Sequence, residues 1–205
     1  MIKNNYFSIR FIILLICVTC ISCDRSRPVT TYGFSQDFKN YTVFNTGSYW
    51  VYEDSASKTI DSIYLVRHQF SFIEEIDGTM KYQYLEEWKH SSLNQSTLFF
   101  KGYIPSGETK AMYAETVPPI LNPGITYFDG EIGTAPDYTY NIYYEEKRNS
   151  ISFQETFHHV KVFLSFYQQY PNHAKRWYYA NHIGLVRKEL YNGQVWNLIR
   201  YHVSQ

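Results

Sequence analysis

The sequence lacks cysteine after position 23, and its three cysteines, Cys17, Cys20 and Cys23, stand with two residues between neighbours. A four-thiolate zinc or iron–sulfur site cannot be completed, because there is no fourth cysteine. The residues between the three continue an apolar stretch, whereas thiolate metal ligands occupy polar, turn-rich loops. The cysteines are therefore not predicted to bind a metal or to form a disulfide framework.

A hydrophobic run long enough to cross a bilayer is also missing. The apolar block from Phe11 to Ile21 is far shorter than the ~20 residues that a spanning helix needs. Lys3 and Arg10 lie before it with no acidic residue, which is the arrangement of a secretory signal. We therefore expect the N-terminal segment to direct export and then to be removed.

The end of this block, "CISC" with Ser22 before Cys23, resembles the lipobox of bacterial lipoproteins. In that family the cysteine after the small residue is acylated and becomes the first residue of the mature chain. The resemblance implies a signal peptide at 1–22 and lipidation at Cys23, although Cys20 stands where the family usually has Leu. It implies a lipid-anchored protein of the cell envelope, in the outer membrane, on its periplasmic or surface face. The alternative is a signal cleaved to release a soluble secreted protein.

Charge of one sign is not in excess. Removing residues 1–22 takes away Lys3 and Arg10 and no acid, which leaves 17 basic and 19 acidic residues of the original 19 and 19. Nucleic-acid binding needs a clustered basic surface, so no nucleic-acid partner is expected. The membrane is expected as a partner only through the N-terminal lipid.

Catalytic motifs are missing as well. The sequence has no Gly-x-Ser-x-Gly elbow, His-Glu-x-x-His pair, P-loop or dinucleotide fingerprint, so no enzyme and no cofactor are predicted. A calcium ion could be held by Asp129, Glu131 and Asp137, but their spacing is not that of an EF-hand, and a solvated loop is the expectation. We therefore assign no catalytic and no metal-binding residue.

What the chain does have is aromatic side chains, at 19% of residues, and 21 of them are tyrosines. Tyrosine suits half-buried sheets, because its ring packs while its hydroxyl stays in water. Period-two alternation dominates after residue 40, with hairpin signals at Asp77-Gly78 and Asn192-Gly193. We predict an all-β fold, with residues 23–39 as lipidated N-terminus and tether and residues 40–205 as a single domain.

The predicted domain has about nine or ten strands, in a curled antiparallel sheet that forms a barrel or half-barrel. A two-layer β-sandwich is the alternative. Two strand faces align three large rings each and are predicted to line a cavity: Tyr82, Tyr84 and Trp88, and Tyr138, Tyr140 and Tyr144. Trp50, in a strand that is apolar on both faces, is predicted to be core.

"NTGSYWVYE" and "RWYYANHIGLVRKELY" resemble segments of uncharacterised β-rich envelope lipoproteins of Gram-negative bacteria. The matching positions imply packing and strand geometry and no chemistry; they are Gly47, Trp50, Tyr52, Ala180, Gly184 and Val186. On function, we expect a binding module for a lipophilic or glycan ligand held by Tyr and Trp rings. The alternative is a structural or assembly subunit that contacts envelope protein partners and binds no small molecule.

Overall fold

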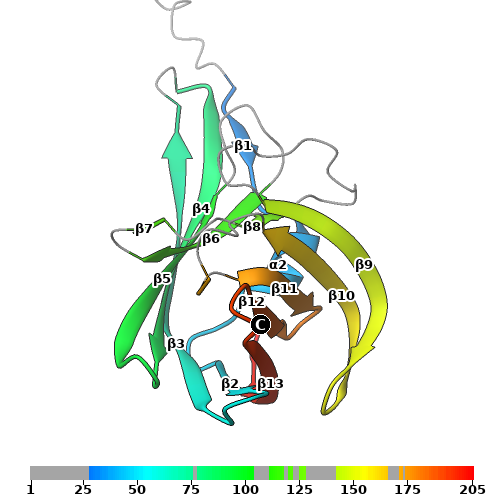
Figure 1. The fold of residues 1–205 in the computed structure, drawn as a ribbon. Helices are drawn as coiled ribbons and strands as arrows, with labels where there is room; N and C mark the ends of the chain where they lie inside the picture. The colour runs from blue at the N-terminus through cyan, green and yellow to red at the C-terminus, as the bar shows by residue number, and fades with distance from the viewer. Residues whose placement is uncertain are drawn as a thin grey trace, which may run out of the picture.

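The computed structural model describes residues 28–205 except 76–77, 104–110, 118–119, 122–124, 128–141, 166–170 and 173. The described chain is mostly β, with one short helix and a single sheet of 13 strands (Figure 1). Ten strands have six or more residues: β2 (Tyr49–Asp54), β3 (Ile60–Glu74), β4 (Met80–Ser91), β5 (Ser96–Tyr103), β6 (Ala111–Val117), β9 (Ile142–Ser152), β10 (Thr156–Ser165), β11 (Ala174–Ala180), β12 (Gly184–Leu190) and β13 (Val195–His202). Three are very short: β1 (Thr30–Tyr32), β7 (Ile120–Leu121) and β8 (Ile125–Tyr127).

The strand order is β7-β6-β5-β4-β3-β2-β13-β12-β11-β10-β9. Neighbouring strands are consecutive in sequence everywhere on this path except at the β2–β13 pair, and they are antiparallel. β1 pairs with β4 in parallel, which makes the sheet mixed. The prediction of a mostly antiparallel β domain with about ten main strands is confirmed.

The prediction of a closed or strongly curled barrel is wrong. The path ends at β7 on one side and β9 on the other, and these strands do not pair within the described residues. The two-layer sandwich is not observed either, because all the described strands belong to one sheet. Local alternation predicts strands but does not determine whether edges distant in sequence will meet.

Both predicted hairpins form. β3 and β4 pair from Ile63–Ser91 to Glu74–Lys81, and Gly78 between them has a φ of +68°. β12 and β13 pair at Glu189–Val195, and Gly193 in their connection has a φ of +90°. Both glycines thus adopt the left-handed backbone region that residues with a Cβ rarely occupy.

The segment before β2 contains a helix that the alternation did not predict, α2 (Gln36–Thr42). The Ser35 side chain accepts a hydrogen bond from the Phe38 amide at 3.0 Å and so caps the N-terminus of the helix. Phe38 and Tyr41, three residues apart, share one buried face. Residues 30–39, which the sequence predicts as part of a tether, thus pair with β4 through β1 and pack into the fold through α2.

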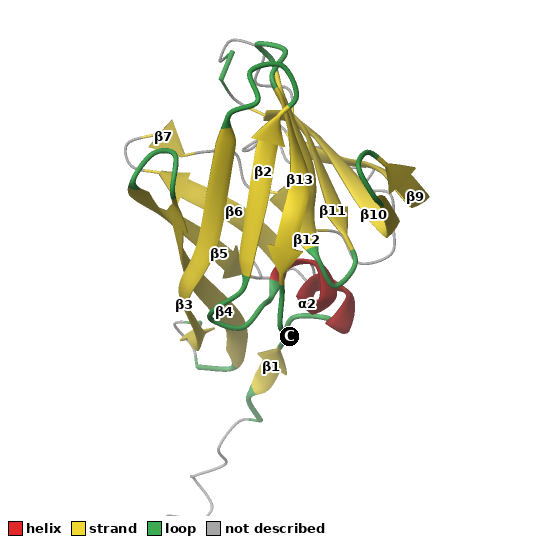
Figure 2. Cartoon of the chain, turned by 90° about the horizontal axis from the view of Figure 1, so that it is seen from below, coloured by secondary structure: helices red, strands yellow, loops and turns green. Residues whose placement is uncertain are grey.

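Buried side chains from both halves of the sheet meet around this helix. One cluster joins Phe38 and Tyr41 to Leu85 of β4 and to Tyr179 of β11. β4 and β11 are separated by four other strands in the sheet order, so the sheet bends around α2. Figure 2 shows the helix against this sheet, beside the C-terminus.

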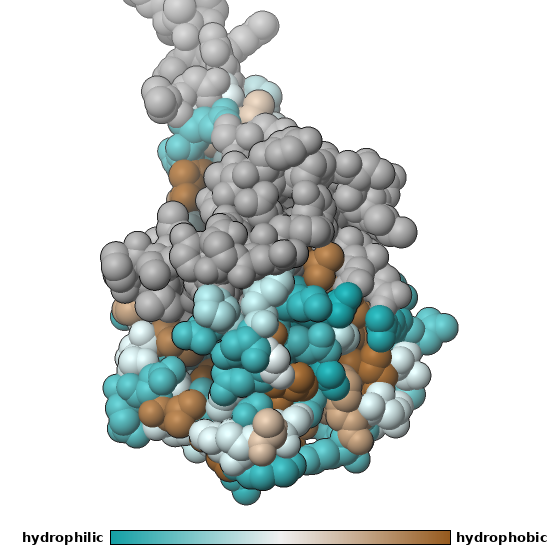
Figure 3. All heavy atoms as spheres, viewed as in Figure 1, coloured by the Kyte–Doolittle hydropathy of each residue, from teal (hydrophilic) through white to brown (hydrophobic). Residues whose placement is uncertain are grey.

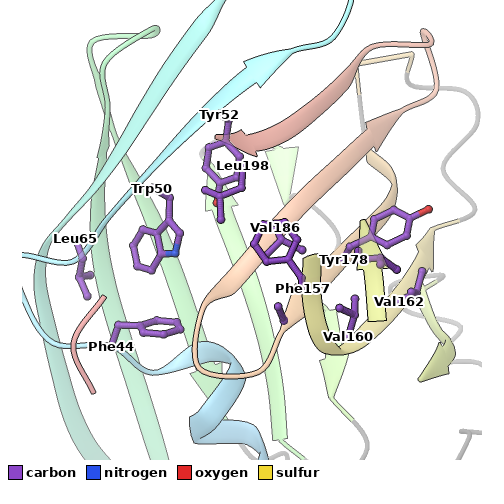
Figure 4. Close-up of a cluster of buried hydrophobic side chains, with 12 residues drawn as sticks. Phe44, Trp50, Tyr52, Leu65, Phe157, Val160, Val162, Tyr178, Val186 and Leu198 are labelled. Carbon is purple, nitrogen blue, oxygen red and sulfur yellow. The ribbon is translucent and has the colours of Figure 1, made fainter. Parts of the chain in front are cut away.

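A second cluster extends over β2, β3 and β9–β13 and is drawn in Figure 4. Its members include Phe44 and Trp50, whose rings meet edge to face with centroids 5.2 Å apart. β2 is buried on both faces from Trp50 to Tyr52, as the sequence predicts. On the face drawn in Figure 3, hydrophobic and hydrophilic residues are intermixed over the coloured part of the chain.

Candidate functional site

A cavity of about 420 Å³ lies on the concave side of the sheet. Its volume falls in the range of small-molecule sites in proteins, which runs from about 300 to 1,000 Å³. Its lining comes from the segment of α2, from β2–β5 and from β11–β13: Tyr41, Thr42, Phe44, Trp50, Tyr52, Asp61, Ile63, Lys89, Leu93, Asn94, Leu98, Phe100, Asn172, Ala174, Trp177, Tyr179, Gly184, Leu185, Lys188, Leu190, Gln194 and Trp196.

The cavity has a buried end and an open end. Tyr41, Phe44 and Trp50, beside α2, are each at most 3% exposed and form the floor. At the other end the lining comes from connections between strands, where Leu93 and Asn94 are exposed. A ligand would enter between these connections and bury its far end against the floor.

Eight of the 22 lining residues are aromatic. Three of the four tryptophans of the chain, Trp50, Trp177 and Trp196, line the cavity. Trp177 is directly opposite Lys188 in the β11–β12 ladder, and Lys188 is opposite Trp196 in the β12–β13 ladder. Opposed residues in an antiparallel sheet point to the same face, so these three side chains form one row across three strands.

The polar atoms of the deep aromatic residues are already engaged. Trp50 Nε1 donates to the Ile183 carbonyl at 2.6 Å, and the Tyr52 hydroxyl donates to the Leu185 carbonyl at 2.8 Å. Burial, together with the nearby Tyr179, raises the pKa of Tyr52 well above its usual value, so its hydroxyl stays protonated. The deep end thus offers a ligand ring surface rather than hydrogen-bond donors.

A buried ion pair lies on the same side of the sheet. Lys89 Nζ is 3.0 Å from Glu87 Oε2, and the two residues are 8% and 0% exposed. The ammonium also lies 4.4 Å from the ring centroid of Phe100 and 5.3 Å from that of Trp50. Lys89 lines the cavity, but its charge is balanced inside the protein by Glu87.

Asp61, the acidic residue of the lining, is occupied by the β4–β5 connection. It accepts hydrogen bonds from the Ser91 hydroxyl at 2.9 Å and from the Leu93 amide at 3.0 Å. It therefore fixes one edge of the cavity entrance, and its carboxylate is satisfied without a ligand.

The predicted wall lies elsewhere. Tyr82, Tyr84 and Trp88 do not contribute to the cavity. Tyr82 stacks on Tyr32 of β1, and Trp88 lies under the guanidinium of Arg67, 4.9 Å from the ring centroid. From Leu85 onwards the buried side of β4 carries Leu85, Glu87, Lys89 and Ser91, and Trp88 lies on the other side. The prediction that Trp88 lines the cavity is therefore wrong.

The second predicted face is only partly described. Tyr138 and Tyr140 lie outside the described residues, and Tyr144 is described as the β9 partner of Phe163. Asp129, Glu131 and Asp137, the calcium alternative, also lie outside them. Sequence reasoning missed three lining residues in particular, Trp177, Trp196 and Lys188. The available signal was that one tryptophan precedes and one follows the predicted Asn192-Gly193 turn.

Two further properties bear on the chemistry of the described part of the chain. No group of three or more His, Cys, Asp or Glu side chains there is placed to hold a metal ion. Its helix is too short and too polar to span a membrane.

The fold and the site thus define a mostly β protein that has one open sheet and a cavity of ligand size lined in part by aromatic rings. No family model, no curated protein and no solved structure matches this chain.

Proposed function

We propose that the protein is an envelope lipoprotein, anchored through Cys23, that binds a lipophilic ligand in the aromatic cavity. The observation that carries the proposal is the cavity itself, about 420 Å³ in volume and lined by Trp50, Trp177 and Trp196. An open-ended cavity of this size with a floor of buried rings favours a ligand over a purely structural role.

Two features favour an apolar ligand over a glycan. Sugar recognition combines ring stacking with hydrogen bonds to hydroxyl groups, and the deep Trp50 and Tyr52 donors are directed to backbone carbonyls. The floor beside them is formed by Phe44 and other fully buried side chains. Apolar surface is stabilised there by about 25 cal/mol for each Å² removed from water.

The anchoring part of the proposal rests on the sequence before residue 28. Replacing Cys23 with Ser removes the thiol that would carry the lipid, so we expect Cys23→Ser to move the protein from the membrane fraction to the soluble fraction. Fractionation and mass spectrometry of the intact chain measure this. A variant that still carries acyl chains and still partitions with membranes would contradict the lipobox interpretation.

The binding part can be tested on the Cys23→Ser chain, which needs no detergent. We expect decanol to bind with one-to-one stoichiometry in calorimetric titration and maltose to give no heat of binding. Leu98→Trp places a larger ring in the cavity wall and should weaken decanol binding at least about tenfold. Thr97→Trp is the matched control, because adjacent strand residues point to opposite faces.

Three results would contradict the binding proposal. The first is the absence of decanol binding, which would favour the structural or assembly role. The second is equal weakening by Leu98→Trp and Thr97→Trp, which would place binding outside the cavity. The third is binding of maltose in preference to decanol, which would indicate a glycan site.

A further inference from the structure

The row of Trp177, Lys188 and Trp196 places one cation between two indole rings on the wall of the cavity. Neighbouring strands lie ~4.8 Å apart, so each ring stands about one strand spacing from the lysine side chain. Lys188 is half-buried and two residues before Leu190, at the open end of the cavity. Its ammonium group can therefore reach a ligand head group that is still partly hydrated.

No acidic side chain in the described residues forms an ion pair with Lys188. The nearest acid in sequence, Glu189, is on the opposite face of β12. There it accepts from Arg187 Nε at 2.9 Å and from the Tyr178 hydroxyl at 2.9 Å, and Arg176 lies 3.6 Å away. Glu189 is thus engaged where it cannot balance the charge of Lys188.

The other charges of the lining do not balance it either. Lys89 is paired with Glu87, so this pair adds no net charge. Asp61 is on β3, three strands from β12 in the sheet order, on the order of 14 Å along the sheet, and its oxygens accept from Ser91 and Leu93. Asp54 is buried opposite Trp196 in the β2–β13 ladder, two strands from Lys188 and on the order of 10 Å along the sheet, and it accepts from the Ser57 hydroxyl at 2.6 Å. Lys188 is therefore the charged residue nearest to a head group held between Trp177 and Trp196.

We infer that the ligand of this cavity is a single-chain anionic amphiphile whose head group pairs with Lys188 between Trp177 and Trp196. This inference rests on the proposed function, since it names the class of ligand for the same cavity. The apolar chain extends from the head toward Phe44 and Trp50 at the floor. At ~30 Å³ for each water-sized atom, 420 Å³ accommodates on the order of a dozen non-hydrogen atoms, about the size of decanoate.

The half-buried position of Lys188 fits this role. A carboxylate or phosphate near the entrance gains a charge-assisted hydrogen bond without full desolvation of either charge. The indole rings on both sides exclude water from the first carbons of the chain. A fatty-acid carboxylate and a lipid phosphate share this chemistry, so both are included as probes.

The test is calorimetric titration of the Cys23→Ser chain with four ligands of one chain length: decanoate, decyl phosphate, decanol and decyltrimethylammonium. We expect at least one anion to bind about tenfold more tightly than decanol, and the cation to bind more weakly than decanol. The tighter of the two anions identifies the head group.

Variants at the row then assign the preference. Lys188→Met keeps the length of the side chain and removes its charge, so anion and alcohol should bind with nearly equal affinity. Lys188→Gln should give the same loss, and Lys188→Arg should keep the preference. Lys175→Met is the matched control, because it removes an exposed positive charge from β11 outside the cavity, and it should leave the preference unchanged.

The outcomes separate the two proposals. Equal binding of anions and decanol by the Cys23→Ser chain overturns the anionic class and leaves the lipophilic site intact. An anion preference that survives both Lys188→Met and Lys188→Gln overturns the pairing of the head group with Lys188. Failure of all four ligands to bind overturns the proposed function and this inference together.

Discussion

Removing the positive partner of the buried Glu87–Lys89 pair should destabilise the fold strongly. Lys89→Met keeps most of the aliphatic side chain and leaves the Glu87 carboxylate, which is 0% exposed, without its ammonium. At 3.0 Å and an effective dielectric constant of about 20, the attraction that is lost is about 5 kcal/mol. Measured losses for one partner of a buried pair are about 3–5 kcal/mol, and we expect Lys89→Met to fall in this range.

The double variant Glu87→Leu/Lys89→Met tests the reasoning behind that number. With both charges removed, no carboxylate is left buried, and apolar side chains occupy the same space beside Phe100 and Trp50. Replacing a whole buried pair is often neutral or stabilising by about 1–4 kcal/mol. We therefore expect the double variant to recover most of the stability that Lys89→Met loses.

The measurement is urea unfolding followed by circular dichroism, analysed as a double-mutant cycle. Lys58→Met is the matched control, since it breaks the Lys58–Glu53 pair at 2.9 Å in which Lys58 is 68% exposed; its cost should stay below about 1 kcal/mol. If Lys89→Met costs no more than Lys58→Met, then Glu87 and Lys89 are solvated and the description of this wall is wrong.

Three other outcomes follow from the structure. Trp50→Ala should lower the free energy of unfolding by about 3–5 kcal/mol in urea unfolding. Trp88 is half-buried on the other side of the sheet, so Trp88→Ala should cost about 2 kcal/mol or less and leave decanol binding unchanged. A larger loss for Trp88→Ala than for Trp50→Ala would show that Trp88, and not Trp50, is the core residue. Burial and then the hydrogen bond to Glu189 raise the pKa of Tyr178 from 10.0 to about 12. Tyr178 therefore adds stability that is complete below pH 10 and is lost as the pH rises toward 12. Tyr178→Phe should make the free energy of unfolding fall less steeply over this pH range, and an unchanged slope would show that Tyr178 ionises normally. Gly184→Ala should cost about 1 kcal/mol or more in urea unfolding, because Gly184 has a φ of +92° and the new methyl group would lie 3.1 Å from the ring of Phe44. An unchanged free energy of unfolding would mean that the Phe44 ring can move.

The main features of the fold could be predicted from the sequence, because they depend on local pattern. Alternation, the tyrosine content and the two Asx-Gly turns indicate antiparallel strands, and β3–β4 and β12–β13 form where they were expected. Helix α2 was not predicted, because its 7 residues are too few to show a clear helical periodicity, although Ser35 is a residue type typical of an N-cap. The open edges at β7 and β9 could not be predicted, since edge pairing depends on contacts between distant segments.

The site was harder to predict, because a period of two does not say which face is buried. The side of β4 with Tyr84 and Trp88 is predicted to line the cavity because it carries the rings, whereas the opposite side carries the charges of Glu87 and Lys89. The structure reverses this, since the two charges neutralise one another inside and Arg67 covers the ring of Trp88 outside. Hydropathy treats each charge singly and therefore cannot detect a buried pair.

The β2–β13 pair has a consequence for how the chain folds. β2 to β6 and β9 to β13 are each built from pairings between strands that follow one another in sequence, and among the described strands β2–β13 is the pairing that joins the two groups. That seam brings together Tyr49 and His202, which are separated by most of the described chain, and pairings of this kind slow folding to milliseconds or seconds. During synthesis the β2–β13 pairing cannot form until the last strand, β13, has been made. The cavity, which is lined by strands on both sides of this pairing, is therefore among the latest features of the molecule to form.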